Sequence, residues 1–200
     1  MLTVGLTGGI GSGKTTIARF FLDQNIEVVN ADQVARKVVE PGTAALSSIK
    51  KRFGSEILIN EKALNRSLLR EKIFKNDDQR IWLENLLHPL IEEEITQLLE
   101  SAVSQYVILE SPLLLETNQH KLVNRILVVD VSPEVQLERT LSRDGGSEAT
   151  IKAIMNSQIS RSDRISLADD IINNEQNFQS VQSRLIKFHQ NYLNLAKKNE

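Results

Sequence analysis

Eight consecutive residues near the start of the chain have the types and spacing needed to bind the phosphates of a nucleotide. The segment is Gly8-Gly9-Ile10-Gly11-Ser12-Gly13-Lys14-Thr15, and it matches the pattern G-x-x-x-x-G-K-[ST]. Glycines allow the backbone torsions that turn successive N–H groups toward an anion, and the following helix adds the positive end of its dipole. We therefore predict a nucleotide-binding phosphate loop.

Two side chains of this loop extend its chemistry. The ammonium group of Lys14 is expected to bridge the β- and γ-phosphates of ATP, and the Thr15 hydroxyl is expected to hold Mg²⁺. The alternative is a glycine-rich turn that only joins a strand to a helix. The loop alone also leaves open a kinase, a nucleotide hydrolase and a binding protein. The expected nucleotide contacts are Gly8, Gly9, Gly11, Ser12, Gly13, Lys14, Thr15 and Thr16.

An acidic residue, Asp32, comes just after the second predicted strand. Ligands of an open parallel sheet bind beyond the carboxyl ends of its strands. A carboxylate there could accept a proton from an acceptor hydroxyl, or orient that hydroxyl, while a phosphoryl group is transferred. The alternative is that Asp32 is the N-cap of a helix through Val34 and Val38, and the two roles are compatible.

The composition restricts the class of protein. Lysine and arginine together number 24 against 26 acidic residues, so no overall positive field attracts nucleic acid. The absence of cysteine excludes disulfides and thiolate metal sites. The apolar runs are shorter than the roughly 20 residues that span a bilayer, and the chain begins with a strand rather than an export signal. We expect a cytoplasmic protein with no membrane or nucleic-acid partner, either a monomer or a weak homo-oligomer.

The elements that must position these residues are short strands that alternate with helices. Their apolar and β-branched residues run on without alternating, which is usual for strands buried on both faces of a parallel sheet. We therefore predict an α/β fold with about five parallel strands. The expected strands are Leu2–Thr7, Ile26–Asn30, Tyr106–Glu110, Arg125–Val131 and Asp170–Asn173.

Two helical insertions are expected within this single domain of 200 residues. The first, from about residue 33 to 103, is too long for a simple crossover and is predicted to form a cap. The second, from about 133 to 167, contains Gly145 and Gly146 as a break or hinge. Apolar residues at spacings of three and four predict a closing amphipathic helix over 181–196.

Several segments, taken together with the phosphate loop, resemble one enzyme family. In type, order and separation they are similar to the motifs of dephospho-coenzyme A kinase. The resemblance implies ATP- and Mg²⁺-dependent phosphorylation of the ribose 3'-hydroxyl of dephospho-coenzyme A, which gives coenzyme A and ADP. It also implies a three-layer α/β/α fold of the nucleotide-kinase type, with a substrate cap and a lid. The segments are Leu6–Lys14, Ala31-Asp32, Val39-Glu40-Pro41-Gly42, His88-Pro89-Leu90-Ile91 and Pro112-Leu113-Leu114.

The cap region supplies the candidate substrate contacts. By resemblance, Asp32 is the acidic residue near the acceptor hydroxyl, and His88, before Pro89 at the expected start of a cap helix, is a candidate substrate ligand. Arg66 and Arg70 lie one helical turn apart and could bind the pyrophosphate or phosphopantetheine arm of the substrate. The alternatives are a capping or packing role for the histidine and a solvated charged face for the arginines.

Arg139 and Arg143 share a helical face in the segment that resembles the lid. Either could contact the transferring phosphoryl group as a catalytic arginine delivered by lid closure, which also excludes water. The alternative is that they pair with Glu138 or Asp144 at the surface.

Other positions carry weaker assignments. By resemblance, Asn30 stands where many relatives have Asp, which argues against a second carboxylate acting at that strand end. Glu110 also stands where many relatives have Asp, so a direct metal contact by Glu110 and a water-linked carboxylate both stay open. Arg161 and Arg164 are weaker lid candidates. The segment Ala168–Asn174 resembles the family's last strand and following turn, near the adenine.

Two rival functions remain. The loop, cap and lid would equally serve a kinase of nucleoside monophosphates or of another small molecule. A non-catalytic module in which ATP orders a loop for a partner protein is the other alternative.

Overall fold

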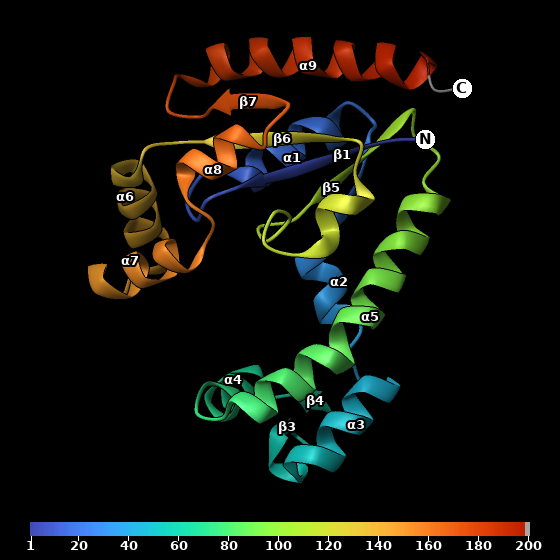
Figure 1. The fold of residues 1–200 in the computed structure, drawn as a ribbon, viewed down its shortest axis with the longest axis vertical. Helices are drawn as coiled ribbons and strands as arrows, with labels where there is room; N and C mark the ends of the chain where they lie inside the picture. Colours follow the sequence, from blue (N-terminus) through green and yellow to red (C-terminus); the bar gives the residue numbers. More distant parts are fainter. Residues whose placement is uncertain (199–200) are drawn as a thin grey trace. The chain divides into compact units, whose positions relative to one another are not determined.

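The computed structural model describes residues 1–198 of the chain. Its packing divides the chain into two compact units, which Figure 1 draws in one view. The sheet unit contains Met1–Asn30 and the chain from Leu98 onward, and the helical unit contains Ala31–Gln97. No helix among the described residues combines the length and the apolar character needed to cross a bilayer.

Within residues 1–198, the sheet unit has five parallel strands in the order β2-β5-β1-β6-β7. The carboxyl ends meet at one edge, where Asn30 pairs with Glu110 and Asp130 pairs with Asn173. The predicted parallel α/β fold is confirmed, and each strand boundary lies within one residue of its predicted position. The strands are β1 (Leu2–Gly8), β2 (Glu27–Asn30), β5 (Tyr106–Glu110), β6 (Arg125–Asp130) and β7 (Asp170–Asn173).

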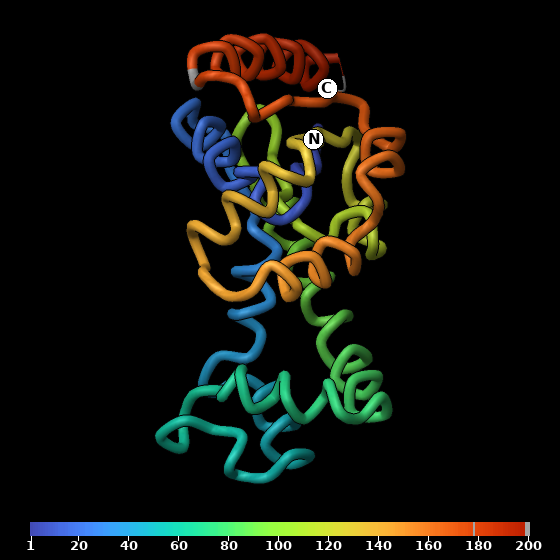
Figure 2. The backbone as a smooth tube through the Cα atoms, turned by 90° about the vertical axis from the view of Figure 1, so that its left-hand side faces the viewer, coloured from blue at the N-terminus to red at the C-terminus, as the bar shows by residue number. Residues whose placement is uncertain are grey.

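One face of the sheet is covered by α1 (Lys14–Asp23) and α9 (Phe178–Lys198), which also contact each other. Figure 2 shows α9 lying along the sheet unit. Phe21 of α1, Tyr106 of β5 and Tyr192 of α9 are fully buried between these layers, and burying a large apolar side chain contributes about 1.5–3 kcal/mol. The closing amphipathic helix predicted from the sequence is thereby confirmed.

Three helices connect β6 to β7 in the region predicted to be a lid. The first follows Ser132, whose hydroxyl accepts from the amide of Val135, and has Pro133 at its first position. It ends at Gly145, and positive φ angles of 66° at Gly145 and 89° at Gly146 make the predicted glycine break. The three are α6 (Pro133–Asp144), α7 (Glu148–Ser157) and α8 (Arg161–Ser166).

The helical unit has a core of its own around Ile49 and Ile57, which are fully buried. It is mostly helical, as expected, but it also holds a two-stranded antiparallel hairpin that the sequence did not indicate, because its strands are two residues long. The elements are α2 (Ala31–Lys37), α3 (Ala44–Phe53), β3 (Leu58–Ile59), β4 (Ala63–Leu64), α4 (Arg66–Phe74) and α5 (Asp77–Ser101), with short 3-10 helices at Ser55–Ile57 and, in the sheet unit, Asn118–Leu122.

One local expectation for the cap, and one alternative considered for Asp32, were wrong. His88 and Pro89 lie inside α5 instead of at the start of a helix. Proline removes one backbone hydrogen bond from a helix interior, and here the residues on both sides continue the helix regardless. Asp32 is not an N-cap, because α2 already begins at Ala31 and Asp32 therefore lies in its first turn.

Candidate active site

The phosphate loop leaves the sheet at the carboxyl end of its central strand. All seven residues of β1 are buried, so the strand fixes the starting point of the loop. Gly13 precedes α1 with φ 89°, a left-handed conformation that favours glycine. A side chain at Gly11 would come within 2.7 Å of the Gln136 carbonyl oxygen, and one at Gly13 would collide with the Asn174 amide. Neighbouring residues, as well as any bound phosphate, therefore require glycine here.

Two side chains of the loop are placed for anion binding. Lys14 folds over the loop and donates from Nζ to the carbonyl oxygens of Gly8, at 2.8 Å, and Gly9, at 3.0 Å. The Ser12 hydroxyl is buried and has no hydrogen-bond partner within the described residues. A buried polar group without a partner costs about 1–3 kcal/mol, and a phosphate oxygen would be a suitable acceptor. The loop therefore fits a phosphate group.

A carboxylate and a hydroxyl meet beside the loop. Glu110, at the end of β5 and only 7% exposed, accepts from the Thr15 hydroxyl at 3.3 Å and from the Asn30 side-chain amide at 2.7 Å. Mg²⁺ prefers oxygen ligands and usually takes one or two from the protein and the rest from phosphates and water. Residues 1–198 contain no cluster of three or more His, Cys, Asp and Glu side chains suited to a metal.

The second half of the loop is held by the turn after β7. The Asn174 side chain donates from Nδ2 to the Ser12 carbonyl at 2.7 Å, and the Asn174 carbonyl accepts from Nη2 of Arg139 at 2.9 Å. This contact links Arg139 to the loop through one residue. Arg143 instead forms an exposed ion pair with Asp144 at 2.6 Å, and this pairing lowers the pKa of the Asp144 carboxyl. The surface pairing considered for Arg143 is the one the structure shows.

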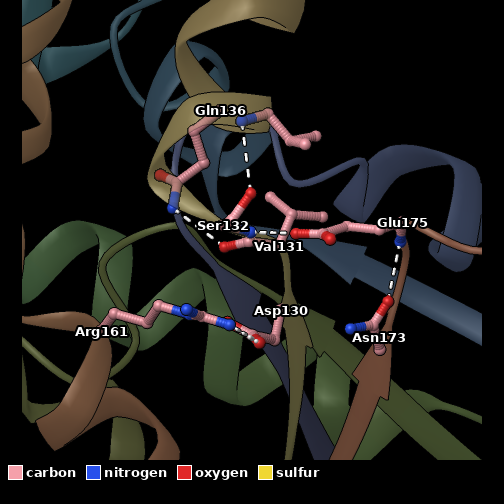
Figure 3. Close-up of polar contacts among 8 residues, drawn as sticks. Asp130, Val131, Ser132, Gln136, Arg161, Asn173 and Glu175 are labelled. Atoms are coloured by element: carbon pink, nitrogen blue, oxygen red, sulfur yellow. Dashed lines mark hydrogen bonds and ion pairs between the residues drawn. The ribbon is translucent and has the colours of Figure 1, made fainter.

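A polar network holds the helices that follow β6 at the carboxyl end of that strand (Figure 3). The buried Asp130 carboxylate accepts from Nε of Arg161 at 2.8 Å and from Nη2 at 2.7 Å. The amide of Ser132 donates to the Glu175 carboxylate, and this hydrogen bond lowers the pKa of Glu175. Gln136 donates from Nε2 to the Val131 carbonyl at 3.4 Å. These contacts anchor α6, α8 and the turn after β7 to one strand end.

The first half of the loop is held by residues between α7 and α8. The amide of Ile10 donates to Oε1 of Gln158 at 3.0 Å. Arg164 is only 6% exposed, donates from Nη2 to the Ile159 carbonyl at 2.8 Å, and has Nη1 3.0 Å from the point where a side chain of Gly9 would begin. Gln158 is not among the site residues predicted from the sequence, and Arg164 is only a weaker lid candidate there. No local signal distinguishes them, because these contacts join segments about 150 residues apart.

The remaining candidates lie in the helical unit. Asp32 is exposed in the first turn of α2, two residues after the end of β2. Arg66 and Arg70 are exposed on α4, one turn apart as predicted, and Arg66 donates to the Arg36 carbonyl at 3.2 Å. His88 is exposed on α5. The roles of these four residues toward a substrate stay predictions.

Comparisons with known proteins agree on one family. A family model described as dephospho-CoA kinase matches residues 2–180. A relative named dephospho-CoA kinase from Mannheimia succiniciproducens is 49% identical over 197 residues, which cover 96% of this chain and 92% of the relative. A solved structure of dephospho-CoA kinase from Campylobacter jejuni has a TM-score of 0.72 at 27% identity, covering 99% of this chain and 98% of that one. A solved Thermus thermophilus structure, at TM-score 0.84 and 24% identity over 94% of this chain and 96% of that one, shows likeness of fold alone.

Proposed function

The chain belongs to the dephospho-CoA kinase family, and we propose that it transfers the γ-phosphoryl group of ATP to the ribose 3'-hydroxyl of dephospho-coenzyme A. The observation that carries the proposal is the family match over residues 2–180. The phosphate loop supports it, because its lysine, its threonine and its glycine contacts are all in place at the end of β1. The products would be coenzyme A and ADP.

The loop would stabilise charge on the transferred group. Lys14 lies over Gly8 and Gly9 and is proposed to move its ammonium group from their carbonyl oxygens to the β- and γ-phosphates. The loop amides and the start of α1 would add partial positive charge, and the Ser12 hydroxyl would gain an acceptor. The proposed nucleotide contacts are Gly8, Gly9, Gly11, Ser12, Gly13, Lys14, Thr15 and Thr16.

We propose that Mg²⁺ is held by the Thr15 hydroxyl, with Glu110 beside it. The metal would neutralise charge between the β- and γ-phosphates when it is bound. Glu110 would orient the threonine hydroxyl, directly or through a water molecule, and Asn30 would hold the second carboxylate oxygen. Asn30 would therefore fix the orientation of the Glu110 carboxylate.

We propose that Asp32 is the catalytic base. The 3'-oxygen would attack the γ-phosphorus, the bond from that phosphorus to the β–γ bridging oxygen would break, and the Asp32 carboxylate would take the hydroxyl proton. Its position supports this, because it follows β2 by two residues and the carboxyl ends of parallel strands are where such ligands bind.

The helical unit is proposed to be the substrate cap, within a single kinase domain. Arg66, Arg70 and His88 are exposed on it and are proposed to bind the pyrophosphate and phosphopantetheine parts of the acceptor. The region from 133 to 167 is proposed to be the lid, in which Arg139 and Arg143 would approach the transferring phosphoryl group. Arg139 has the stronger support, because it already reaches the loop through Asn174.

The choice of acceptor tests this function. The protein would be incubated with ATP and Mg²⁺ and, separately, with dephospho-coenzyme A, each nucleoside monophosphate, and shikimate, and ADP formation would be measured. We expect ADP and a stoichiometric amount of coenzyme A only with dephospho-coenzyme A. ADP formed only with another acceptor would support a different small-molecule kinase, and nucleotide binding without transfer to any acceptor would support a non-catalytic module.

A further inference from the structure

Arg164 is a buried cation placed against the phosphate loop. Its side chain comes from α8, is 6% exposed, and has Nη1 3.0 Å from the point where a side chain of Gly9 would begin, a point that Gln136 Oε1 approaches to 2.4 Å. Among the residues that the structure describes, no carboxylate lies within 4.0 Å of this guanidinium to form an ion pair. Burial lowers the pKa of Arg164, although the more distant carboxylates of Glu116 and Asp130 act against that shift. A buried charge with one neutral hydrogen-bond acceptor is costly unless something compensates it.

The neighbouring arginines show that this arrangement is unusual within the chain. Arg161, three residues earlier on the same helix, pairs with Asp130, and Arg125 pairs with Asp170 at the opposite edge of the sheet. Both are more exposed than Arg164 and have a carboxylate partner, so their structural role is sufficient to explain them. Arg164 makes a hydrogen bond to the Ile159 carbonyl, and this contact does not require a charge.

The surroundings of Arg164 are rigid in a way that suits ligand binding. Gln158 accepts from the Ile10 amide at 3.0 Å, and the Ile159 amide donates to the Glu116 carboxylate at 3.0 Å. The Ile159 carbonyl then accepts from Arg164 itself. The short segment from Gln158 to Ile159 therefore fixes the guanidinium relative to the loop, and preorganised donors are what phosphoryl transfer requires.

Two cations converge on the same residue of the loop. Lys14 donates to the Gly9 carbonyl at 3.0 Å, and Nη1 of Arg164 lies 3.0 Å from the point where a Gly9 side chain would begin. A phosphate-loop lysine serves the β- and γ-phosphates. With Lys14 on these phosphates, the Gly9 end of the loop would be the end nearer the terminal phosphoryl group.

We propose that Arg164 binds the terminal phosphoryl group of ATP at the Gly9–Ile10 part of the loop, and that Gln158 is a positioning residue that holds Arg164 and the loop together. This rests on the proposed nucleotide site but not on the identity of the acceptor. The bound phosphate supplies the counter-charge that the folded protein lacks around Arg164, so the arginine distinguishes ATP from ADP.

The test compares nucleotide binding and stability in four variants. Arg164→Met removes the charge at similar length, Arg164→Lys keeps the charge without the forked geometry, and Arg184→Met is the matched control on the exposed surface of α9. Dissociation constants for ADP and a non-hydrolysable ATP analogue would be measured by calorimetry with Mg²⁺, and unfolding temperatures without nucleotide. Gln158→Leu would be measured in parallel.

We expect Arg164→Met to weaken binding of the ATP analogue on the order of 10- to 100-fold, the range of a charged hydrogen bond, and to change ADP binding less than about threefold. Its unfolding temperature without nucleotide should equal or exceed that of the wild type, because an uncompensated buried charge is lost. Arg164→Lys should give an intermediate dissociation constant for the ATP analogue. Gln158→Leu should also weaken binding of the ATP analogue, but by less. Arg184→Met should leave the dissociation constants of both ligands unchanged.

Equal loss of ATP-analogue and ADP binding in Arg164→Met would overturn the proposal, as would unchanged binding with a lower unfolding temperature. Either result would make Arg164 a structural residue. Neither result bears on the proposed acceptor. The proposed function would be contradicted by a different result, namely that the wild-type protein does not transfer a phosphoryl group to dephospho-coenzyme A.

Discussion

The two edges of the central sheet differ in two polar side chains: both edges hold paired groups, but only the carboxyl edge combines them with Ser12 and Arg164, which lack such partners within the described residues. At the amino edge, the Tyr106 hydroxyl is paired with Nδ1 of His189 at 2.8 Å, and the Tyr192 hydroxyl donates to Asp170 at 2.8 Å. Asp170 also accepts from Nη2 of Arg125 at 3.0 Å. Each of these groups has a protein partner, and His189 and Tyr192 belong to α9. At the carboxyl edge, the buried Ser12 hydroxyl has no partner in the described residues and Arg164 has no carboxylate beside it.

This difference distinguishes polar side chains that stabilise the fold from polar side chains that are available to a ligand. Satisfied buried networks rigidify a fold, whereas buried groups left without a partner cost stability and are retained where a ligand completes them. Burial alone does not mark the site, because Tyr192 is as deeply buried as any loop residue. Substitutions at the carboxyl edge should therefore lower turnover with little loss of stability, and substitutions at the amino edge should do the reverse.

The largest effect is expected from Lys14→Ala. Removing the ammonium group takes away the full positive charge that lies over the loop, and loss of one preorganised charge stabiliser costs on the order of 10²- to 10³-fold in turnover. Steady-state ADP formation would be measured against Lys187→Ala, an exposed lysine of α9. The unfolding temperature should stay near that of the wild type. If turnover of Lys14→Ala stays within a few-fold of wild type, the proposed functional role of the carboxyl edge would be contradicted at its most important residue.

Asp32→Asn is expected to have the next largest effect. The amide keeps the shape of the side chain but cannot take a proton, so turnover should fall on the order of 100-fold while ATP binding is retained. A loose transition state would make the loss smaller, because proton removal then lags behind phosphoryl transfer. Asp23→Asn at the exposed end of α1 is the control. Unchanged turnover would remove Asp32 as the base.

Glu110→Gln should have a smaller effect that depends on the metal. The amide can still accept from Thr15, but it brings no negative charge to the metal, and a partner of this kind typically contributes 10- to 100-fold in metal affinity. We expect the Mg²⁺ concentration for half-maximal turnover to rise about tenfold, with activity largely restored at high Mg²⁺. A loss of turnover that no Mg²⁺ concentration restores would contradict a metal-linked role.

The sequence revealed the parts of this site that are local in the chain. The phosphate loop is contiguous, and five short runs rich in apolar and β-branched residues indicate the strands, so both can be predicted from the sequence. Arg164 could not be ranked above Arg161, because the two share a helix and differ only in what distant segments place beside them. Gln158 could not be predicted as a site residue for the same reason.

The wrong expectations also have physical causes. The His88-Pro89 pair suggested the start of a helix because proline favours the first turn, yet α5 continues through the pair from Asp77 to Ser101. The β3–β4 hairpin has two residues per strand, too few to show a period. In α5, the preference of proline for the first helical turn did not decide where the helix begins. In the β3–β4 hairpin, the strands are too short for a sequence pattern to form.

The smallest effect is expected at the amino edge, where His189 should make stability depend on pH. Burial lowers the pKa of the His189 imidazole, which is about 6.5 in an unfolded chain, so the unfolded state binds the proton more readily. The free energy of unfolding should therefore be highest above pH 6.5 and should fall as the pH decreases below 6.5 toward the folded pKa. Turnover per folded molecule should not follow this change.

The measurement is urea unfolding between pH 8 and pH 5 in the wild type, His189→Gln and His120→Gln. Glutamine at 189 can still hydrogen-bond to Tyr106 but does not titrate, so this variant should lose part of the fall in stability below pH 6.5. His120 is exposed at the surface and serves as the control. If His189→Gln keeps the wild-type pH slope and instead lowers turnover, the amino edge takes part in function and the contrast between the two edges fails.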